Sequence, residues 1–485
     1  MARPNTTPAR GARANRPVRA ARPARSALLL VLALLLAAIG YLGVGTGRQL
    51  LADRSFRPIA VPAPTAAPPG IGALLSQAPA PPAAARSRPN APVPTPAGVA
   101  AALAGALADP ELGPSVAGQV FDADTGALLF DQRSTESVAP ASTAKLLTAA
   151  AILSVRQAGD RFSTRVVAGA EPGTVVLVGG GDPTLSAAPA GQPTRYAVAA
   201  RITDLAARVK AGLGGTAVRR VLVDDSAFTG PGSAPGWDPV DTPSSYASLI
   251  TATMVDAGRD SADAEIRSAA PELAAGTALA DALGGAEVGP GQAPAGARLL
   301  GQVRSAPVDV LVEQMMRASD NVIAEVLARQ VAIATSRPAS FAGAAEAIRA
   351  VLGGAGIEIG TGMVDGSGLS VRDRIPAAAL ARALLVTLDP AHSRLRPLLS
   401  GLSIAGWDGT LLDEGRFSGP AAIADGAVRA KTGTLTGVSG MAGLVTDADG
   451  RLLVFSFVAD QAPAEGPSRV AVDALVATLV RCGCR

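Results

Sequence analysis

Lysine is so rare in this sequence that each one is a candidate for a chemical role. Lysine and arginine together number 43, and only three of these are lysines, namely Lys145, Lys210 and Lys431. Arginine can replace lysine at a solvated surface, but it cannot take up a proton, because its pKa exceeds about 12. Burial, by contrast, can lower the pKa of an amine until it acts as a neutral base. The chemistry to expect at such a lysine is therefore proton abstraction.

Ser142 stands three residues before Lys145, in the segment 140–145, which reads PASTAK. At the start of a predicted helix, this spacing places the hydroxyl and the amine one turn apart on the same face. The positive end of the helix and burial both favour the neutral amine and a developing alkoxide. The pair is typical of a nucleophilic serine activated by a lysine base, although the same serine could simply cap the helix.

A second lysine opens the run Lys431-Thr432-Gly433-Thr434, inside a predicted strand. Glycine within a strand allows the backbone of a ligand to approach closely. Thr432 and Thr434 lie two residues apart, so their hydroxyl groups share one face and can bind a carboxylate. An ordinary edge strand with a solvated lysine would show the same residues.

The remaining candidates have simpler interpretations when each is taken alone. The tripeptide Ser-Asp-Asn at 319–321 lies between two predicted helices, where all three residue types cap well. His392, the only histidine, lies in a turn without a G-x-S-x-G elbow, so a Ser-His-Asp triad is not indicated. Cys482 and Cys484 either form a local disulfide or remain thiols, and they indicate neither a metal site nor a cofactor. Lys210 is interpreted as a surface residue.

Three of these patterns occur in an order that resembles a known family. Ser142-x-x-Lys145 comes first, Ser-Asp-Asn at 319–321 second and Lys-Thr-Gly at 431–433 third, as in serine β-lactamases and penicillin-binding proteins. The long first gap resembles the D-alanyl-D-alanine carboxypeptidase/endopeptidase family, the class C low-molecular-mass penicillin-binding proteins, which carry extra domains there. The resemblance covers about residues 98–480. Further similar segments are residues 179–185, 225–228, 319–325, 365–370 and 406–411.

The resemblance implies a serine D-Ala-D-Ala carboxypeptidase, with endopeptidase activity as an additional option, acting on peptidoglycan stem peptides in cell-wall remodelling. Ser142 would attack the carbonyl group that joins two D-alanines after Lys145 takes its proton. Ser319 would relay the proton towards the leaving amine. The backbone N–H groups of Ser142 and Thr434 would hold the oxyanion. β-Lactams imitate the substrate and would acylate Ser142.

The resemblance also implies a set of residues that bind the substrate. Asn321 would hold the substrate amide. Lys431, Thr432 and Thr434 would hold the terminal carboxylate, with Gly433 between them allowing close approach.

Two other functions could use the same residues. A β-lactamase or esterase would need a base for fast deacylation, and the sequence contains no convincing E-x-x-x-N loop. The third function is a non-catalytic penicillin-binding sensor or wall-binding scaffold, and the presence of both Ser142 and Lys145 argues against it. The pair therefore favours an enzyme, and the missing loop favours a peptidase.

The elements around these residues predict an α+β fold. Hairpins near both ends of the folded region can pair into one antiparallel sheet, covered by a last helix. The resemblance implies the same architecture, a penicillin-binding/serine β-lactamase-like transpeptidase domain with a smaller domain inserted between the first two patterns. The expected catalytic domain comprises residues 98–161 and 304–485, and the expected inserted domain comprises residues 162–303. The helices expected beside the site span 142–155 and 308–331, the latter stretch being divided at 319–321 into a helix that ends near Met316 and a second one over 322–331. The expected strands span 115–121, 127–131, 438–446 and 452–458.

The N-terminal region predicts export. Residues 1–26 form an arginine-rich cytoplasmic tail, and residues 27–45 are apolar enough for a transmembrane signal-anchor or a cleaved signal peptide. Residues 46–97 form a Pro/Ala-rich linker, so the enzyme would work outside the cytoplasm, either membrane-anchored or secreted after cleavage. The net charge of +3 comes mostly from the tail, and with 3% aromatic residues the sequence indicates no nucleic-acid partner.

Overall fold

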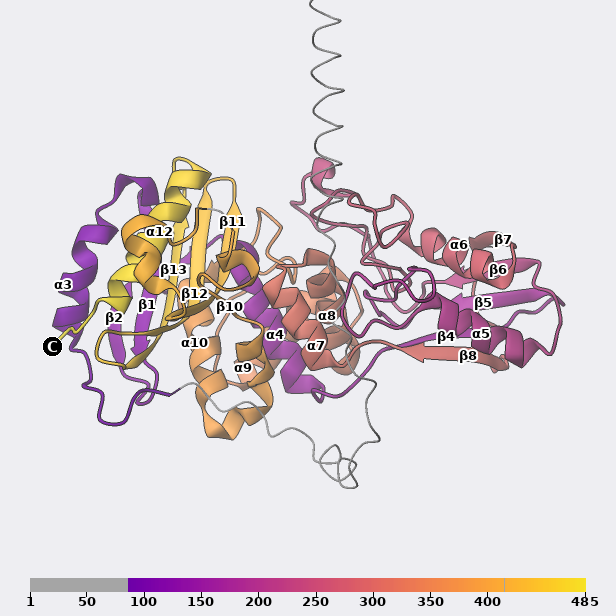
Figure 1. The fold of residues 1–485 in the computed structure, drawn as a ribbon, viewed down its shortest axis with the longest axis horizontal. Helices are drawn as coiled ribbons and strands as arrows, with labels where there is room; N and C mark the ends of the chain where they lie inside the picture. Colours follow the sequence, from indigo (N-terminus) through magenta and orange to yellow (C-terminus); the bar gives the residue numbers. More distant parts are fainter. Residues whose placement is uncertain (1–85, 414) are drawn as a thin grey trace, which may run out of the picture. The chain divides into compact units, whose positions relative to one another are not determined.

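The computed structural model describes residues 86–413 and 415–485, and its elements carry the labels of Figure 1. The expected tail, the expected membrane segment and residues 46–85 of the expected linker lie outside the described residues. Within the described ranges, no helix is both long and apolar enough to cross a membrane. The last residues of the expected linker contact the body, because Leu452 N donates to Ser87 Oγ and Arg88 N donates to Gly450 O.

A six-stranded antiparallel sheet forms the centre of the body. Its strands are Ser115–Asp122 (β1), Leu128–Gln132 (β2), Ser403–Ile404 (β10), Val428–Leu435 (β11), Val438–Thr446 (β12) and Leu452–Asp460 (β13). They are arranged in the order β10-β11-β12-β13-β1-β2. Ser115 of β1 lies opposite Asp460 of β13, which confirms that the hairpins at the two ends of the body pair into one sheet.

Helices cover both faces of this sheet (Figure 1). Pro96–Leu107 (α3) and Glu465–Val480 (α12) lie on one face, and Ala377–Leu388 (α10) contacts the strands on the other. Lys145–Val155 (α4) packs against α10, and four further helices pack around α4, namely Val308–Arg317 (α7), Asn321–Ala334 (α8), Phe341–Gly354 (α9) and Pro397–Ser400 (α11). Side chains alternate between the faces of a strand, so β13 contributes to two cores. Leu453 and Phe455 pack with α3 and α12, whereas Val454 and Val458 pack with α4, α8 and α10. The α+β class expected from the sequence is confirmed.

The expected helices beside the site begin or end at candidate functional residues. The expected helix 142–155 begins as a 3-10 turn, Ala141–Ala144 (η2), and α4 starts at Lys145. The expected break at 319–321 is confirmed, because α7 ends at Arg317 and α8 begins at Asn321. Ser319 in the turn between these helices has a φ of +54°, a value that few residues other than glycine adopt and that cannot continue a helix.

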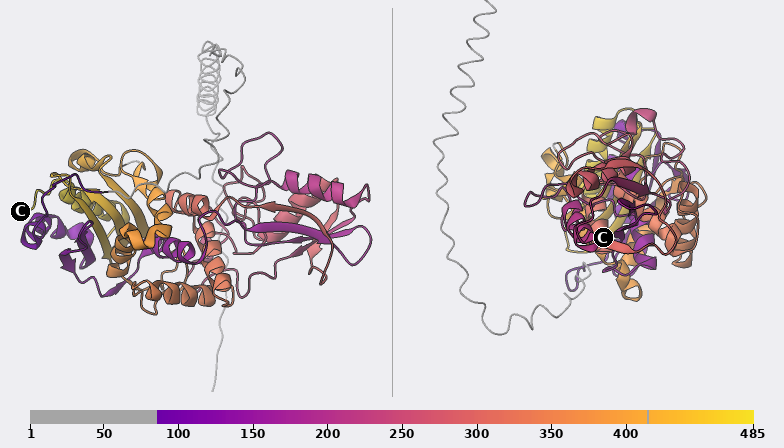
Figure 2. Two further views of the ribbon diagram at one scale, coloured as in Figure 1. Left: turned by 90° about the horizontal axis from the view of Figure 1, so that it is seen from below. Right: turned by 90° about the vertical axis from the view of Figure 1, so that its right-hand side faces the viewer.

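Residues 163–304 build a second, five-stranded sheet. Its strands are Ser163–Ala168 (β4), Thr174–Val178 (β5), Arg220–Asp224 (β6), Glu287–Pro290 (β7) and Leu299–Arg304 (β8), in the order β7-β6-β5-β4-β8. β5, β6 and β7 are parallel, so a helix connects each successive pair. The two helices are Ile202–Leu213 (α5) and Pro271–Leu283 (α6), and they contact each other on one face of the sheet (Figure 2). Between these helices and the sheet lies a hydrophobic core that is separate from the cores of the first sheet.

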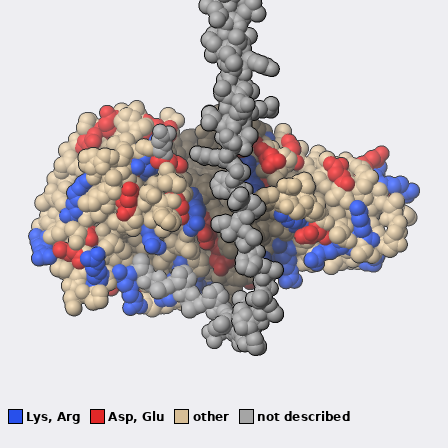
Figure 3. Space-filling model, in the orientation of Figure 1, with Lys and Arg blue, Asp and Glu red and all other residues tan. Residues whose placement is uncertain are grey.

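The described surface carries charges of both signs. On the face shown in Figure 3, Lys and Arg side chains are interspersed with Asp and Glu side chains. Exposed ion pairs contribute to this pattern, for example Arg133 with Glu136 and Arg220 with Glu287.

Candidate active site

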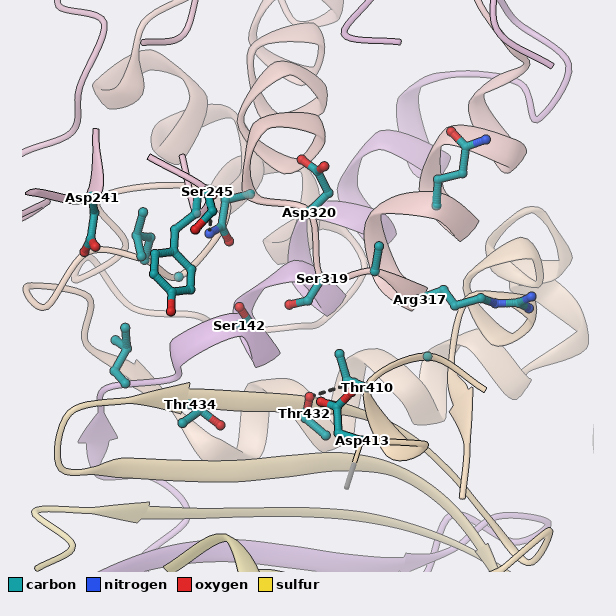
Figure 4. A pocket seen from close by; sticks show the side chains of 18 of the residues that line it. Ser142, Asp241, Ser245, Arg317, Ser319, Asp320, Thr410, Asp413, Thr432 and Thr434 are labelled. Carbon is teal, nitrogen blue, oxygen red and sulfur yellow. Dashed lines mark hydrogen bonds between the residues drawn. The ribbon is translucent and has the colours of Figure 1, made fainter. Parts of the chain in front are cut away.

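A cavity of about 940 Å³ brings the three sequence patterns together. Figure 4 shows the hydroxyl groups of Ser142 and Ser319 above the strand that carries Thr432 and Thr434. The predicted site residues that line the cavity are Ser142, Ser319, Asn321, Thr432 and Thr434. The other three, Lys145, Lys431 and Gly433, are buried and do not line it.

A tight turn presents Ser142 to the cavity. The preceding residue, Ala141, is fully buried with a φ of +46°, a strained conformation that its surroundings must enforce. Thr143 closes the turn, because its N–H and its hydroxyl both donate to Pro140 O. Gly433 of β11 packs directly against this turn, and a Cβ atom there would lie 2.8 Å from Pro140 O. The glycine of the third pattern therefore sets how closely the strand approaches the nucleophile.

Lys145 is fully buried, and its Nζ has three neighbours at hydrogen-bonding distance. Nζ lies 2.8 Å from Ser142 Oγ, 2.6 Å from Asn321 Oδ1 and 2.8 Å from Ser367 O. Burial lowers the pKa of Lys145 to about 8, against the opposing effect of nearby carboxylates, of which Asp365 contributes most. Carbonyl oxygens only accept, so a neutral amine would donate to both of them. Its lone pair then faces the one neighbour that can donate, the Ser142 hydroxyl.

Two buried carboxylates hold the Ser367 carbonyl group in place. Glu325 accepts from the Ser367 N–H at 2.8 Å, and Asp365 accepts from the N–H groups of Gly368 and Ser370 at 2.6 and 2.7 Å. The sequence analysis noted segments 319–325 and 365–370 only for their similarity to the family, so the support that Glu325 and Asp365 give to the base was missed. The available signal was an aspartate before Gly-Ser-Gly, which is typical of a turn closed by a side chain.

The second pattern forms the turn between α7 and α8. Asp320 caps α8, because its Oδ1 accepts from the N–H groups of Val322 and Ile323, as expected of this residue type. Ser319 precedes it, and its hydroxyl reaches the cavity wall (Figure 4).

Asn321 uses both ends of its amide within the protein. Its Oδ1 accepts from Lys145 Nζ, and its Nδ2 donates to Tyr246 O at 3.1 Å. The resemblance implied a contact with the substrate amide instead. In this structure Asn321 orients the base and links it to the segment that carries the second sheet.

The third pattern faces the cavity with its threonines. Thr432 and Thr434 share one face of β11, as the period of a strand predicts. Thr432 Oγ1 donates to Thr410 Oγ1 at 2.8 Å, and Thr410 also lines the cavity (Figure 4). Sequence reasoning noted the segment 406–411 but did not single out Thr410.

Lys431 lies behind the cavity wall. Its Nζ donates to Thr432 O at 2.9 Å. Burial, together with the positive charges of Lys145 and Arg416, holds the pKa of Lys431 well below its usual range. Lys431 is buried and does not line the cavity, and its predicted contact with a carboxylate stays a prediction. Arg416, which sequence reasoning missed, lines the cavity and forms a buried ion pair with Asp473.

The residues set aside by the sequence interpretation lie elsewhere. His392 lies in a 3-10 segment, Pro390–Leu395 (η4), with Nδ1 3.4 Å from Asp389 Oδ2, and Lys210 is exposed on α5. Cys482 and Cys484 form a disulfide, which decides between the two alternatives for this pair. Within residues 86–413 and 415–485, no group of three or more His, Cys, Asp or Glu residues is arranged to hold a metal ion.

Comparison with protein families matches the model of the D-Ala-D-Ala carboxypeptidase 3 (S13) family over residues 99–266 and 260–479. These ranges include all three sequence patterns and both sheets.

Similar proteins come from mycobacteria. A carboxypeptidase of Mycobacterium tuberculosis is 46% identical over 438 residues, which cover 88% of this chain and 91% of that protein. Carboxypeptidase DacB of Mycolicibacterium smegmatis is 43% identical over 461 residues, which cover 94% of this chain and 96% of that protein. Among solved structures, penicillin binding protein 4 of Haemophilus influenzae aligns with a TM-score of 0.62 at 21% identity, covering 77% of this chain and 99% of that one. The structural likeness confirms the expected penicillin-binding fold.

Proposed function

The chain belongs to the D-Ala-D-Ala carboxypeptidase 3 (S13) family and is a D-Ala-D-Ala carboxypeptidase, and we propose that it cleaves peptidoglycan stem peptides through an acyl-enzyme on Ser142. The observation that carries this mechanism is the set of three contacts at Lys145 Nζ. A neutral amine there donates its two hydrogens to Asn321 Oδ1 and Ser367 O, so its lone pair is free to accept the Ser142 hydroxyl proton. The cavity of about 940 Å³ is larger than a D-Ala-D-Ala end requires. Its size supports longer peptides as substrates, cross-linked peptides included.

Acylation begins with the neutral amine of Lys145. It takes the hydroxyl proton of Ser142 while Oγ attacks the carbonyl carbon between the two D-alanines. The N–H groups of Ser142 and Thr434 stabilise the oxyanion, and each such donor contributes about 3 kcal/mol. Ser319 then passes the proton from Lys145 to the amine nitrogen as the C–N bond breaks. D-Alanine leaves, and the peptide remains as an ester on Ser142.

Hydrolysis of the ester reverses the proton path. A water molecule attacks the ester carbonyl while Lys145 takes one of its protons. The ester C–O bond breaks, the proton returns to Ser142 Oγ, and the shortened peptide leaves as a carboxylic acid. A β-lactam follows the same acylation, but its ring-opened amine stays attached, so we expect a long-lived acyl-enzyme.

The terminal carboxylate of the substrate binds to the threonine face of β11. Thr432 and Thr434 offer hydroxyl groups there, and the Thr410 hydroxyl next to Thr432 extends the set of donors. Arg416 also lines the cavity and adds positive potential there, although its buried ion pair with Asp473 offsets part of that charge. Lys431 would support this face by donating to Thr432 O, which fixes the part of the strand that presents the two threonines.

The enzyme works outside the cytoplasm, where its substrate lies. Residues 27–45 would act as a signal-anchor or a cleaved signal peptide, and the proline-rich residues that follow would separate the catalytic domain (98–161 and 304–485) and its inserted domain (162–303) from the membrane. Fractionation of cells, with N-terminal sequencing of the protein, distinguishes the two. Recovery of the protein from the cytosol would contradict export.

The mechanism is tested with purified wild type and Ser142→Ala. Wild type should become labelled by a fluorescent penicillin and should release D-alanine from a pentapeptide, whereas Ser142→Ala should do neither. Labelling that persists in Ser142→Ala would remove Ser142 as the nucleophile. Rapid turnover of nitrocefin would support a β-lactamase instead, and labelling without D-alanine release would support a sensor.

A further inference from the structure

The segment that carries the second sheet binds directly to the turn that holds Ser319 and Asn321. Tyr196 OH donates to Asp320 Oδ2 at 2.7 Å, and Arg267 Nη2 lies 3.6 Å from the same oxygen. We propose that Tyr196 and Arg267 are positioning residues that hold this turn in its reactive geometry. The inference rests on the catalytic roles proposed above for Ser319 and Asn321.

Asp320 is suited to act as the anchor of the turn, because its two oxygens bind different parts of the molecule. Oδ1 caps α8 of the body, whereas Oδ2 faces the phenol and the guanidinium of the other segment. The side chain of Asp320 is 8% exposed and that of Arg267 is 3% exposed. A carboxylate this deeply buried needs its partners, since leaving it unpaired costs several kcal/mol.

Arg267 is itself fixed in place. Its Nε donates to Ala257 O at 2.9 Å, and its Nη1 donates to the carbonyl oxygens of Ser244 and Ser245. These carbonyl groups belong to the loops beside Tyr246, whose own carbonyl oxygen accepts from Asn321 Nδ2. The guanidinium of Arg267 therefore contacts Asp320 and also orders the loop whose Tyr246 carbonyl group binds Asn321.

Tyr196 is fixed in the same manner. Arg259 Nη1 lies 3.5 Å from Tyr196 OH and also donates to Asp256 O at 2.9 Å. Burial, with the neighbouring charge of Asp320, raises the pKa of Tyr196 well above its usual value. The phenol therefore keeps its proton and remains a donor to Asp320.

The turn has reason to need this support. Ser319 has a φ of +54°, and such a conformation persists only where the surroundings enforce it. A second contact links the same segment to the preceding helix. Gln314 Nε2 of α7 donates to the carbonyl oxygen of Ala197, which follows Tyr196 in the sequence. If these contacts are lost, we expect Ser319 to move away from the cavity wall and Asn321 Oδ1 to move away from Lys145 Nζ. Tyr196 and Arg267 also line the cavity, so the test must separate an effect through the turn from a direct contact with the ligand.

The test uses a small fluorescent penicillin and measures the second-order rate constant of acylation. Tyr196→Phe and Arg267→Met should each lower it by about tenfold or more, because each removes a donor to a buried carboxylate. Arg201→Met is the matched control. Arg201 also donates to backbone carbonyl groups of the same segment, those of Pro189 and Gln192, but it does not contact Asp320 and does not line the cavity. This variant should be acylated at the wild-type rate.

The same two substitutions are then combined with Ser319→Ala. If Tyr196 and Arg267 act through the turn, their effects should shrink in the Ser319→Ala background rather than multiply. Thermal unfolding identifies any variant that has lost its fold, and Tyr196→Phe, which keeps the ring, remains informative if Arg267→Met unfolds. Wild-type acylation of Tyr196→Phe, or losses that multiply fully, would overturn the inference. Wild-type acylation of Ser319→Ala would instead overturn the proposed role of Ser319.

Discussion

The two regions that meet at the cavity contribute to it in different ways. The body supplies side chains that can react or bind, with Ser142 and Lys145 foremost. The segment that builds the second sheet supplies a phenol, a guanidinium and a backbone carbonyl group, all directed at the turn around Asp320. Few residue types can act as nucleophile or base, so chemistry restricts the first set, whereas many buried donors could serve in the second. Short sequence patterns therefore reveal the first kind of residue and leave the second hidden.

The substitution Lys145→Arg tests the claim that chemistry restricts the body's residues, and it carries the largest expected effect. Nearly all the other basic residues of this chain are arginines, and arginine keeps the positive charge of lysine on a side chain of similar length. It cannot become neutral, however, and a general base contributes about 10²–10⁴-fold to a rate. We therefore expect acylation by penicillin to fall by about a thousandfold.

The matched control is Lys210→Arg, which changes an exposed lysine on α5 and should leave acylation unchanged. If Lys145→Arg were acylated within a few-fold of the wild-type rate, Lys145 would not be the base. The claim that the residues of the body are restricted by their chemistry would then fail at Lys145.

The same difference explains which parts of the fold were predictable. The hairpins β1–β2 and β12–β13 are local, and their alternating apolar residues predict strands without knowledge of the rest of the chain. Their pairing across the body could be expected because both hairpins lie near the ends of the folded region. The second sheet joins β5, β6 and β7 in parallel through helices, so its contacts are distant in sequence. β7 and β8 also lie within the Ala/Gly-rich residues 264–300 or at their edge, where no strong strand pattern appears.

The support of the base was hidden for a related reason. Glu325 and Asp365 act on Lys145 through backbone N–H groups and a carbonyl group, which are common to all residues. No spacing in the sequence marks such a contact. Thr410 escaped notice similarly, because a single hydroxyl next to Thr432 has meaning only after the chain has folded.

The substitution Glu325→Gln tests whether the body, like the segment of the second sheet, contains residues that act by holding others in position. Glu325 is fully buried, accepts from the Ser367 N–H and pairs with Arg329 at 3.7 Å. Arg329 also lies over the Phe341 ring, 4.0 Å from its centroid, and would keep an unpaired buried charge after the substitution. We expect the free energy of unfolding, measured in denaturant, to fall by about 3 kcal/mol.

Glu136→Gln is the control for this effect. Glu136 pairs with Arg133 at 2.6 Å, but both side chains are exposed, and surface ion pairs contribute little. Its unfolding curve should coincide with that of the wild type. Equal losses in the two variants would mean that the Glu325 pair is no more than an ordinary ion pair, and the body would contain no hidden support of this kind.

The pH dependence of acylation tests the environment of Lys145 with the smallest change, the loss of one proton. Burial lowers the pKa of Lys145 to about 8, and only the neutral amine can take the Ser142 proton. Below this pKa the neutral fraction falls about tenfold with each pH unit, so the acylation rate constant should rise with pH between 6 and 8 and level off above 8. Penicillin is a suitable probe, because its carboxylate does not titrate in this range. A rate that stays constant or falls between pH 6 and 8 would mean that the residues around Lys145 do not prepare a neutral base. The three contacts at Nζ would then describe a structural ammonium, and the body would resemble the second region in supplying position rather than reactivity.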